Sequence, residues 1–303
     1  MTKIDFEDKV AIITGAGAGL GRDYAIELAK RGAKVVVNDL GGARDGSGEG
    51  LSAIADKVVA EIKASGGEAV PNYDNVATID GGENIVQTAI DAFGKVDILI
   101  NNAGILRDKS FPNMLEENWD AVLNVHLKGT YCVTRPAFIC MKQNGYGRIV
   151  MTSSIAGVIG NFGQTNYGSA KMGIVGLTNV LKIEGAKYNI NVNVILPSAG
   201  TRLTDDVLPP EMFEAFKVEH ITPAVLYMCS EQCRDTGMYI NAFGGYFSRS
   251  AILTGPGKTY SEMPTPEQIM ENWNQITDLE NAQFYNDVNQ MMMGVYDFEL
   301  IKP

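Results

Sequence analysis

The sequence is poor in the residues that build metal and thiol sites. Only two of its 303 residues are histidine, which excludes a His-rich metal site. Its four cysteines are Cys132, Cys140, Cys229 and Cys233. They form pairs eight and four residues apart, so neither pair has the C-x-x-C spacing of a zinc or redox site. We expect buried free thiols and no bound metal.

Positive charge is also scarce. The 25 Lys and Arg residues face 36 Asp and Glu residues, a net charge of −11, and no basic run occurs. This balance argues against nucleic-acid and membrane-surface binding. No apolar run approaches the roughly 18 residues of a membrane span. The start MTKIDFEDKV is too charged for a signal peptide, and the final IKP matches no address signal. We expect a cytoplasmic protein that binds a small molecule.

Linker-like segments and internal repeats are missing from the first 250 residues. Apolar runs instead alternate with amphipathic stretches, of which 23–32 and 51–67 have helical spacing and end at glycines. The runs predict strands at 9–15, 33–39, 68–74, 96–104, 147–154 and 191–197, with a weaker seventh at 237–245. This alternation predicts an α/β fold, a Rossmann-type doubly wound parallel sheet of about seven strands.

The sequence changes character after GPGK at 255–258. Thr265 and Pro266 predict the start of a helix, and an Asn/Gln-rich stretch with three consecutive methionines follows. We expect one Rossmann domain over 1–254 and a C-terminal helical extension over 255–303. The extension should dock on the main domain or on a second subunit, and a partly disordered linker is the alternative.

A glycine-rich turn, IITGAGAGLG, joins the first predicted strand to a helix. Gly15, Gly19 and Gly21 allow a tight turn and the close approach of a pyrophosphate to the helix N-terminus. The second strand ends at Asp39, 18 residues beyond Gly21, where a carboxylate can bind the adenosine ribose. A carboxylate there repels a 2′-phosphate, and Ala18 offers no cation to hold one. The pattern predicts NAD rather than NADP.

Four motifs resemble those of the short-chain dehydrogenase/reductase family. They are TGAGAGLG (14–21), NNAG (101–104), Ser154, and Tyr167 with Lys171 four residues later. Ser154 precedes Tyr167 by 13 residues, a gap typical of the family. GNFGQTNY (160–167) and WNQITDLENA (273–282) resemble the branch that oxidises (3R)-3-hydroxyacyl-CoA thioesters, and the resemblance covers nearly the whole chain.

The resemblance implies the cofactor contacts by position. The glycine loop with Gly15, Gly19, Leu20 and Gly21 would hold the pyrophosphate, and Asp39 the ribose. The other implied contacts are the adenine edge at Asp74 and Asn75, the cofactor wall at Asn101 and Gly104, and the nicotinamide side at Ala199, Gly200 and Thr201. The family also implies a homo-oligomer, commonly a dimer or a tetramer.

Ser154, Tyr167 and Lys171 are the expected catalytic residues. Oxidation of an alcohol needs a base for the hydroxyl proton, and the tyrosine pKa of ~10 is too high unless it is lowered. Lys171 lies one helical turn beyond Tyr167 and should lower that pKa. In the family, the lysine also contacts the nicotinamide ribose. Ser154 can donate to the substrate oxygen. The alternatives are a packed aromatic and a capping serine.

Two stretches depart from the family pattern. PSAGTRLT (197–204) replaces the usual Pro-Gly after the sixth strand, which leaves the nicotinamide contacts there open. Many relatives have an asparagine that steadies a water in the proton relay. Here His126 occupies that position and Asn124 lies two residues earlier. A packed histidine with a hydrogen-bonded ring is the alternative for His126, and we assign the relay to neither side chain.

The substrate end is less defined by sequence. Residues 202–223 are expected to form a mobile flap beside the nicotinamide. The side chains that could line an acyl groove, or simply the buried face of a short helix, are Leu208, Met212, Phe213 and Phe216. The cations that could meet the phosphates of coenzyme A are Arg107, Lys109, Arg202, Lys217 and Arg249.

The leading hypothesis is therefore an NAD-dependent (3R)-3-hydroxyacyl-CoA dehydrogenase. A dehydrogenase of a steroid or of another secondary alcohol shares the same chemistry. Asp39 and Ala18 disfavour an NADPH-linked 3-oxoacyl carrier-protein reductase. A non-catalytic nucleotide-binding protein is the hypothesis from a different class, and it would have no need of the catalytic triplet.

Overall fold

The computed structural model describes residues 3–48, 52–204 and 209–295. The chain divides into two units, Met1–Arg249 and Ser250–Pro303. The boundary expected at residue 254 stays a prediction.

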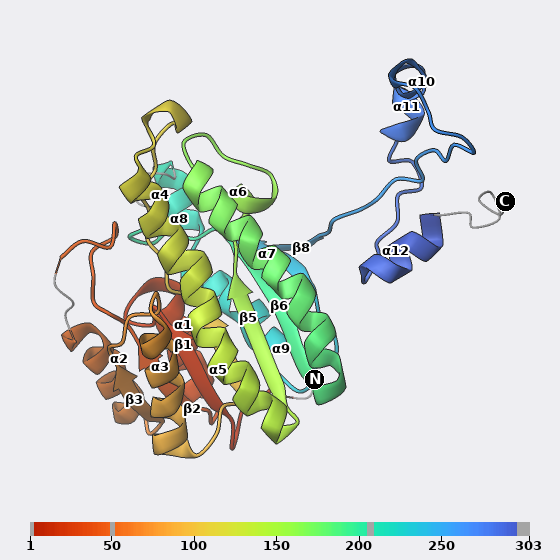
Figure 1. Cartoon of the computed structure of the whole chain (residues 1–303). Coiled ribbons are helices and arrows are strands. Elements are labelled where there is room, and N and C mark those ends of the chain that lie inside the picture. The colour runs from red at the N-terminus through yellow and green to blue at the C-terminus, as the bar shows by residue number, and fades with distance from the viewer. Residues whose placement is uncertain (1–2, 49–51, 205–208, 296–303) are drawn as a thin grey trace. The chain divides into compact units, whose positions relative to one another are not determined.

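An eight-stranded sheet lies at the centre of the first unit (Figure 1), in the order β3-β2-β1-β4-β5-β6-β7-β8. The strands are β1 (Val10–Thr14), β2 (Lys34–Asn38), β3 (Glu68–Asn72), β4 (Ile98–Asn101), β5 (Gly147–Thr152), β6 (Ile190–Pro197), β7 (Tyr239–Phe243) and β8 (Tyr246–Ser250). The pairs from β3 through to β7 are parallel. The prediction of a doubly wound α/β sheet is confirmed.

The eighth strand was not predicted. Gly244 and Gly245 both have positive φ, 52° and 84°, as a two-residue hairpin turn requires, and the turn returns the chain beside β7. Most of β8 is exposed or only partly buried. It therefore lacks the apolar run by which the other strands were found.

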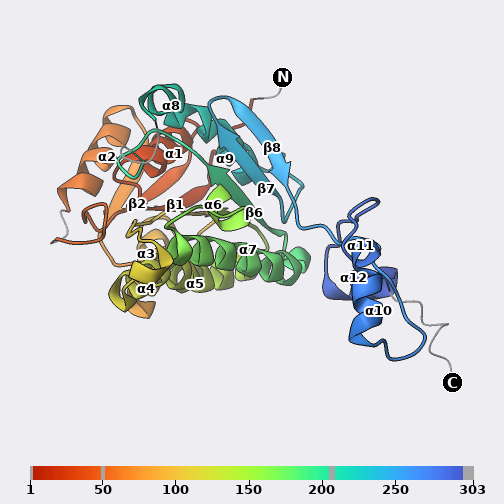
Figure 2. The same cartoon turned by 90° about the horizontal axis from the view of Figure 1, so that it is seen from above.

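Helices cover both faces of the sheet (Figure 2), and each face has its own apolar core. One core lies under α1 (Gly19–Ala29), α2 (Ala53–Ala64) and α9 (Thr222–Cys229). The other lies under α3 (Ile79–Phe93), α5 (Gly129–Asn144) and α7 (Thr165–Gly185). The shorter helices of this unit are α4 (Glu116–Leu123), α6 (Ile155–Val158) and α8 (Pro210–Ala215).

A π-helical turn, η2 (Asn124–Lys128), joins α4 to α5. Such turns are rare and are found frequently at functional sites. No pattern in the sequence indicated it. It carries His126, whose environment is described below.

The strand order changes direction between β1 and β4. From β1, the chain adds β2 and β3 on one side and then adds β4 and the later strands on the other side. In doubly wound sheets this switch opens a crevice at the carboxyl ends of the strands. The topology thus places the ends of β1, β2, β4 and β5 around one crevice.

The second unit contains α10 (Pro266–Glu271), α11 (Trp273–Ile276) and α12 (Val288–Val295). The predicted helix start is present, since Thr265 and Gln268 form a reciprocal capping box. None of the residues in these helices is buried. Among the described residues of the whole chain, no helix has both the length and the apolarity to cross a membrane.

Candidate active site

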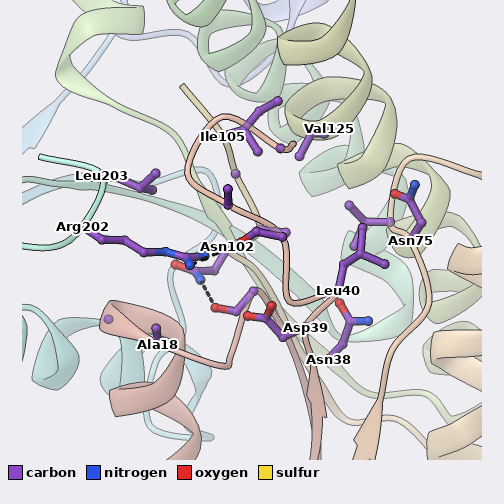
Figure 3. A pocket seen from close by; sticks show the side chains of 18 of the residues that line it. Ala18, Asn38, Asp39, Leu40, Asn75, Asn102, Ile105, Val125, Arg202 and Leu203 are labelled. Atoms are coloured by element: carbon purple, nitrogen blue, oxygen red, sulfur yellow. Dashed lines mark hydrogen bonds between the residues drawn. The ribbon is translucent and has the colours of Figure 1, made fainter. Parts of the chain in front are cut away.

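The glycine loop between β1 and α1 needs glycine for two physical reasons. Gly15 has φ of +63°, and a Cβ on it would lie 2.8 Å from the Cα of Ala103. A Cβ on Gly21 would lie 2.3 Å from the backbone oxygen of Gly15. The loop therefore packs closely against the start of the helix and against the segment after β4. Above it lies a cavity of about 300 Å³ (Figure 3).

Asp39 follows β2 and borders this cavity (Figure 3). Its side chain is buried, and its two oxygens accept hydrogen bonds from the backbone N–H groups of Gly17 and Gly41, each at 2.8 Å. These bonds fix the carboxylate without neutralising it. Arg22, a possible partner for a 2′-phosphate, instead pairs with Glu61 at 2.6 Å.

Most of the expected cofactor residues lie around this cavity. Those that line it are Gly15, Gly19, Leu20, Asp39, Asp74, Asn75, Gly104 and Thr201. Ala199 lines the adjoining cavity described next. The glycine loop, the adenosine end and the loop after β6 thus meet, as a dinucleotide requires. The residues around the two cavities fit a dinucleotide.

Three expected residues reach neither this cavity nor the adjoining one. Gly21 lies beneath the glycine loop, and Gly200 packs so closely on Phe213 that a Cβ would lie 2.3 Å from its backbone oxygen. The Asn101 side chain points inward and donates to Thr134 Oγ1 at 2.8 Å. Asn102 takes its place at the cavity, with Nδ2 3.1 Å from the backbone oxygen of Gly15.

A second cavity, of about 360 Å³, brings Ser154, Tyr167 and Lys171 together. Leu20, Asn102, Gly104, Thr201 and Leu203 line both cavities. A ligand in the nucleotide cavity can therefore reach the three expected catalytic side chains.

Lys171 is almost wholly buried, and its Nζ donates to the backbone oxygen of Thr152 at 2.6 Å. Nζ lies 5.4 Å from the centre of the Tyr167 ring. Burial lowers the pKa of Lys171 to about 7, and burial raises the pKa of Tyr167 to about 12. The expected lowering of the tyrosine pKa by Lys171 is thus absent in this state, because desolvation outweighs the lowering effect of the Ser154 hydrogen bond. Tyr167 is held as a phenol.

Ser154 has two contacts. It ends the β5 segment as the N-cap of α6, where Oγ accepts from the N–H of Ala156 at 3.1 Å. Its side chain also hydrogen-bonds Tyr167, which acts to lower the pKa of the phenol against burial. The capping role and the catalytic position therefore coexist. Since Oγ accepts from the backbone, its own proton can be donated toward the tyrosine or a substrate oxygen.

His126 packs within the site. Its ring lies edge-on to Tyr167, with ring centres 5.1 Å apart, and Nε2 lies 2.8 Å from the backbone oxygen of Ile105. A Cβ on Gly104 would lie 2.4 Å from its Cε1, so the glycine of NNAG makes room for the ring. Burial, followed by the charge of Lys171, holds the pKa of His126 well below its usual value. The ring is therefore neutral. Asn124 borders the nucleotide cavity.

Of the expected acyl-groove residues, those that the structure describes are not part of the second cavity. Met212 is exposed, Phe213 packs on Gly200, and Phe216 stacks on Phe243 with ring centres 5.5 Å apart. Leu208 lies outside the described residues. Arg107 and Arg202 border the nucleotide cavity, and their side chains donate to the backbone oxygens of the 40–48 loop.

The family model for short-chain dehydrogenases matches residues 9–207. The chain belongs to this family and is an oxidoreductase of the short-chain dehydrogenase type.

Proteins of related sequence extend this assignment. A Mycobacterium tuberculosis protein, named provisionally a short-chain type dehydrogenase/reductase, is 52% identical over 91% of this chain and 96% of its own length. The peroxisomal hydratase-dehydrogenase-epimerase of Saccharomyces cerevisiae is 47% identical over 97% of this chain. The chain spans only 33% of that larger relative.

Two solved structures have the same fold. Full-length peroxisomal multifunctional enzyme type 2 from Drosophila melanogaster matches 96% of this chain and 49% of its own, with a TM-score of 0.80 and 39% identity. A 7α-hydroxysteroid dehydrogenase, solved with NADH and 7-oxo glycochenodeoxycholic acid, matches 81% of this chain and 98% of its own, with a TM-score of 0.73 and 29% identity. The resemblance noted from the motifs is confirmed.

Proposed function

We propose that the chain is an NAD-dependent dehydrogenase that interconverts (3R)-3-hydroxyacyl-CoA and 3-oxoacyl-CoA. The observation that carries the proposal is the convergence of Ser154, Tyr167 and Lys171 on a cavity that adjoins the nucleotide cavity bordered by Asp39.

Each catalytic side chain has a distinct task. The nicotinamide, when bound, supplies the hydride acceptor. Tyr167 exchanges a proton with the substrate oxygen, and Ser154 donates a hydrogen bond to that oxygen as negative charge develops. In this state Tyr167 is poised to donate its proton, which suits carbonyl reduction. For alcohol oxidation, a charged Lys171 closer to the phenol must stabilise the phenolate.

The choice of NAD rests on Asp39. Its fixed carboxylate can accept hydrogen bonds from the two ribose hydroxyls, whereas a 2′-phosphate would meet a buried negative charge. The NADH in the related steroid dehydrogenase structure supports a nicotinamide nucleotide.

The choice of a hydroxyacyl thioester rests on the resemblance and on the names of the relatives. A hydratase adds water to a double bond and produces an alcohol, which is what a dehydrogenase oxidises. The name hydratase-dehydrogenase-epimerase joins these activities in one relative. The related steroid dehydrogenase, with its bound 7-oxo bile acid, supports a steroid as the second candidate.

The test is NADH formation with a panel of substrates. The panel contains (3R)- and (3S)-3-hydroxyacyl-CoA thioesters, hydroxysteroids and simple secondary alcohols, each with NAD and with NADP. We expect the highest kcat/KM with a (3R)-thioester and NAD. Absence of turnover on every thioester, or equal kcat/KM with the two cofactors, would contradict the proposal.

A homodimer or homotetramer in the cytoplasm belongs to the same proposal. Exposed apolar side chains on α5 and α7 support an oligomer, namely Tyr131, Ile139, Val180 and Ile183. Light scattering on the purified chain tests it, and a monomeric mass at micromolar concentration would contradict it.

A further inference from the structure

A row of three hydrogen-bonded side chains leads from a carboxylate to the wall of the catalytic cavity. Gln164 Nε2 donates to Asp108 Oδ2 at 2.7 Å, and Asn161 Nδ2 donates to Gln164 Oε1 at 3.1 Å. Gln164 is only 7% exposed, whereas Asn161 is exposed at the cavity. Asn161 and Gln164 line the same cavity as Ser154 and Tyr167. None of these three side chains was singled out from the sequence.

The chemistry of the three groups fixes the orientation of both amides. An ionised carboxylate can only accept, so Gln164 must present its NH₂ group to Asp108 and its oxygen to Asn161. Asn161 must then present an N–H to Gln164. Either amide alone could be flipped by rotation, but the row anchored on Asp108 permits one arrangement. One N–H of Asn161 is used in the row, and its second N–H is left to donate to a ligand.

Two other hydrogen bonds hold these segments together without the row. The Lys109 N–H donates to the backbone oxygen of Gly163 at 2.9 Å, and Asn166 Nδ2 donates to the backbone oxygen of Arg107 at 3.0 Å. Asp108 is also electrostatically unfavourable for a base, because its charge raises the pKa of Tyr167. The charge of Asp108 therefore does not serve the tyrosine, whereas its hydrogen bond from Gln164 gives it a role in the row.

We propose that Asn161 donates a hydrogen bond to the thioester carbonyl oxygen of a 3-hydroxyacyl substrate, and that Gln164 and Asp108 are positioning residues that hold its amide in the donating orientation. This inference rests on the proposed function. The hydrogen bond from Asn161 distinguishes a 3-hydroxyacyl thioester from an alcohol that has no second oxygen within reach. The recognised group is the thioester itself, so the proposal holds equally for a coenzyme A ester and for a carrier-bound ester.

The test compares two thioesters, which share this carbonyl group, with an alcohol that lacks it. They are (3R)-3-hydroxybutanoyl-CoA, the same acyl group on N-acetylcysteamine, and (R)-2-pentanol. In Asn161→Ala we expect kcat/KM to fall about tenfold for both thioesters and less than about twofold for the alcohol, as the loss of one hydrogen bond predicts. Asn113→Ala, at an exposed asparagine in the segment 111–113, is the matched control.

An equal loss on all three substrates, or no loss on the thioesters, overturns the assignment of Asn161. A loss on the CoA ester alone also overturns it, because the contact would then be to the nucleotide part. Binding of NADH and the Tm of each variant show that the fold is intact.

The positioning residues are tested by coupling. Asp108→Asn keeps the size of the side chain and an acceptor oxygen but can also donate, so it no longer fixes the row. We expect a several-fold fall in the thioester-to-alcohol ratio of kcat/KM, a ratio that cancels changes in the Tyr167 pKa. In the double variant with Asn161→Ala, Asp108→Asn should add nothing further. Additive losses would show that Asp108 acts by another route.

Failure of this inference is distinguishable from failure of the proposed function. A wild-type chain that oxidises the alcohol but neither thioester contradicts both the function and the inference. A wild-type chain that oxidises both thioesters, with an Asn161→Ala variant unchanged in its selectivity, contradicts the inference alone.

Discussion

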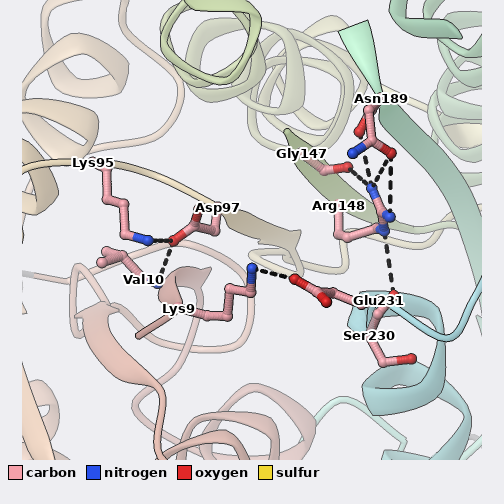
Figure 4. Close-up of polar contacts among 9 residues, drawn as sticks. All are labelled: Lys9, Val10, Lys95, Asp97, Gly147, Arg148, Asn189, Ser230 and Glu231. Atoms are coloured by element: carbon pink, nitrogen blue, oxygen red, sulfur yellow. Dashed lines mark hydrogen bonds and ion pairs between the residues drawn. The ribbon is translucent and has the colours of Figure 1, made fainter. Parts of the chain in front are cut away.

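The two edges of the sheet, at the amino and at the carboxyl ends of its strands, hold their buried charged groups differently. At the amino edge (Figure 4), Arg148 is 1% exposed and its guanidinium donates to three backbone oxygens, among them those of Asn189 and Ser230. Asp97, just before β4, accepts from the N–H of Val10 at 2.9 Å. These charged groups are satisfied by the chain itself.

At the carboxyl edge, polar groups are buried without such partners. Among the described residues, no hydrogen-bond partner meets His126 Nδ1 or Thr152 Oγ1, and both residues line the catalytic cavity. Lys171 beside them is 3% exposed, with a lowered pKa. Unsatisfied buried groups destabilise a fold.

The difference separates stability from function. At the amino edge, the buried charged groups bind backbone groups and stabilise the sheet. At the carboxyl edge, donors, acceptors and a cation stay available to a ligand. Proteins commonly sacrifice stability at such sites. Substitutions at the amino edge should therefore change unfolding more than turnover, and those at the carboxyl edge the reverse.

The largest effect is expected from Tyr167→Phe. It removes the group that exchanges the substrate proton, so kcat should fall about 10²- to 10⁴-fold with little change in stability. Steady-state NADH formation measures the loss, and fluorescence titration should show NADH affinity within about twofold of wild type. Tyr227→Phe, at an exposed position on α9, is the control. Substantial turnover in Tyr167→Phe would remove the tyrosine from the mechanism.

Arg148→Met should have the largest effect on stability. It removes the donor to three backbone oxygens, two of them in the buried residues Gly147 and Ser230, at a cost of about 4 kcal/mol in the free energy of unfolding. Urea unfolding measures the change. Arg135→Met, at a 54% exposed side chain, should stay within about 0.5 kcal/mol. If Arg148→Met were as stable as wild type but lost turnover, the proposed separation of the two edges would be wrong.

The sequence predicted the parts of the fold that depend on apolar runs and glycines. All seven predicted strands are present, since each buries side chains on both faces of the sheet. β8 was missed because its residues are exposed or only partly buried and form no apolar run, although Gly244-Gly245 is a hairpin signal.

The sequence indicates which residues meet at the candidate site, but it does not indicate their pKa values. Asn101 was chosen over Asn102, although alternation along β4 turns neighbouring side chains to opposite sides. The spacing of Tyr167 and Lys171 predicts that they meet, but burial sets both pKa values, and spacing does not reveal burial. The row through Gln164 joins residues 56 positions apart, which no local pattern can indicate.

Lys171→Met tests the stability that the carboxyl edge sacrifices. The lysine pKa falls from 10.5 to about 7 on folding, so the unfolded chain binds this proton more tightly. Lys171 therefore destabilises the fold below about pH 7, and the effect fades as the pH rises toward 10.5. We expect the variant to be inactive but more stable than wild type by about 3 kcal/mol at pH 6, with the gap closing by pH 10.

Urea unfolding across this pH range measures the gap. Lys57→Met, at an exposed position on α2, is the control. A gap that stays constant with pH would mean that Lys171 is charged throughout and that the carboxyl edge sacrifices no stability through this group.

The smallest effect is expected from Glu231→Gln. Lys9 and Glu231 form an ion pair of 2.6 Å at the amino edge, but the glutamate side chain is 61% exposed. The hydrogen bond from Lys9 lowers the pKa of Glu231, so any stabilisation is present above pH 4.5 and is lost as the pH falls. At pH 7 the loss should stay below about 1 kcal/mol and shrink further in 1 M salt. A loss of unfolding free energy as large as that of Arg148→Met would mean that exposed ion pairs, rather than buried hydrogen bonds, stabilise this edge of the sheet.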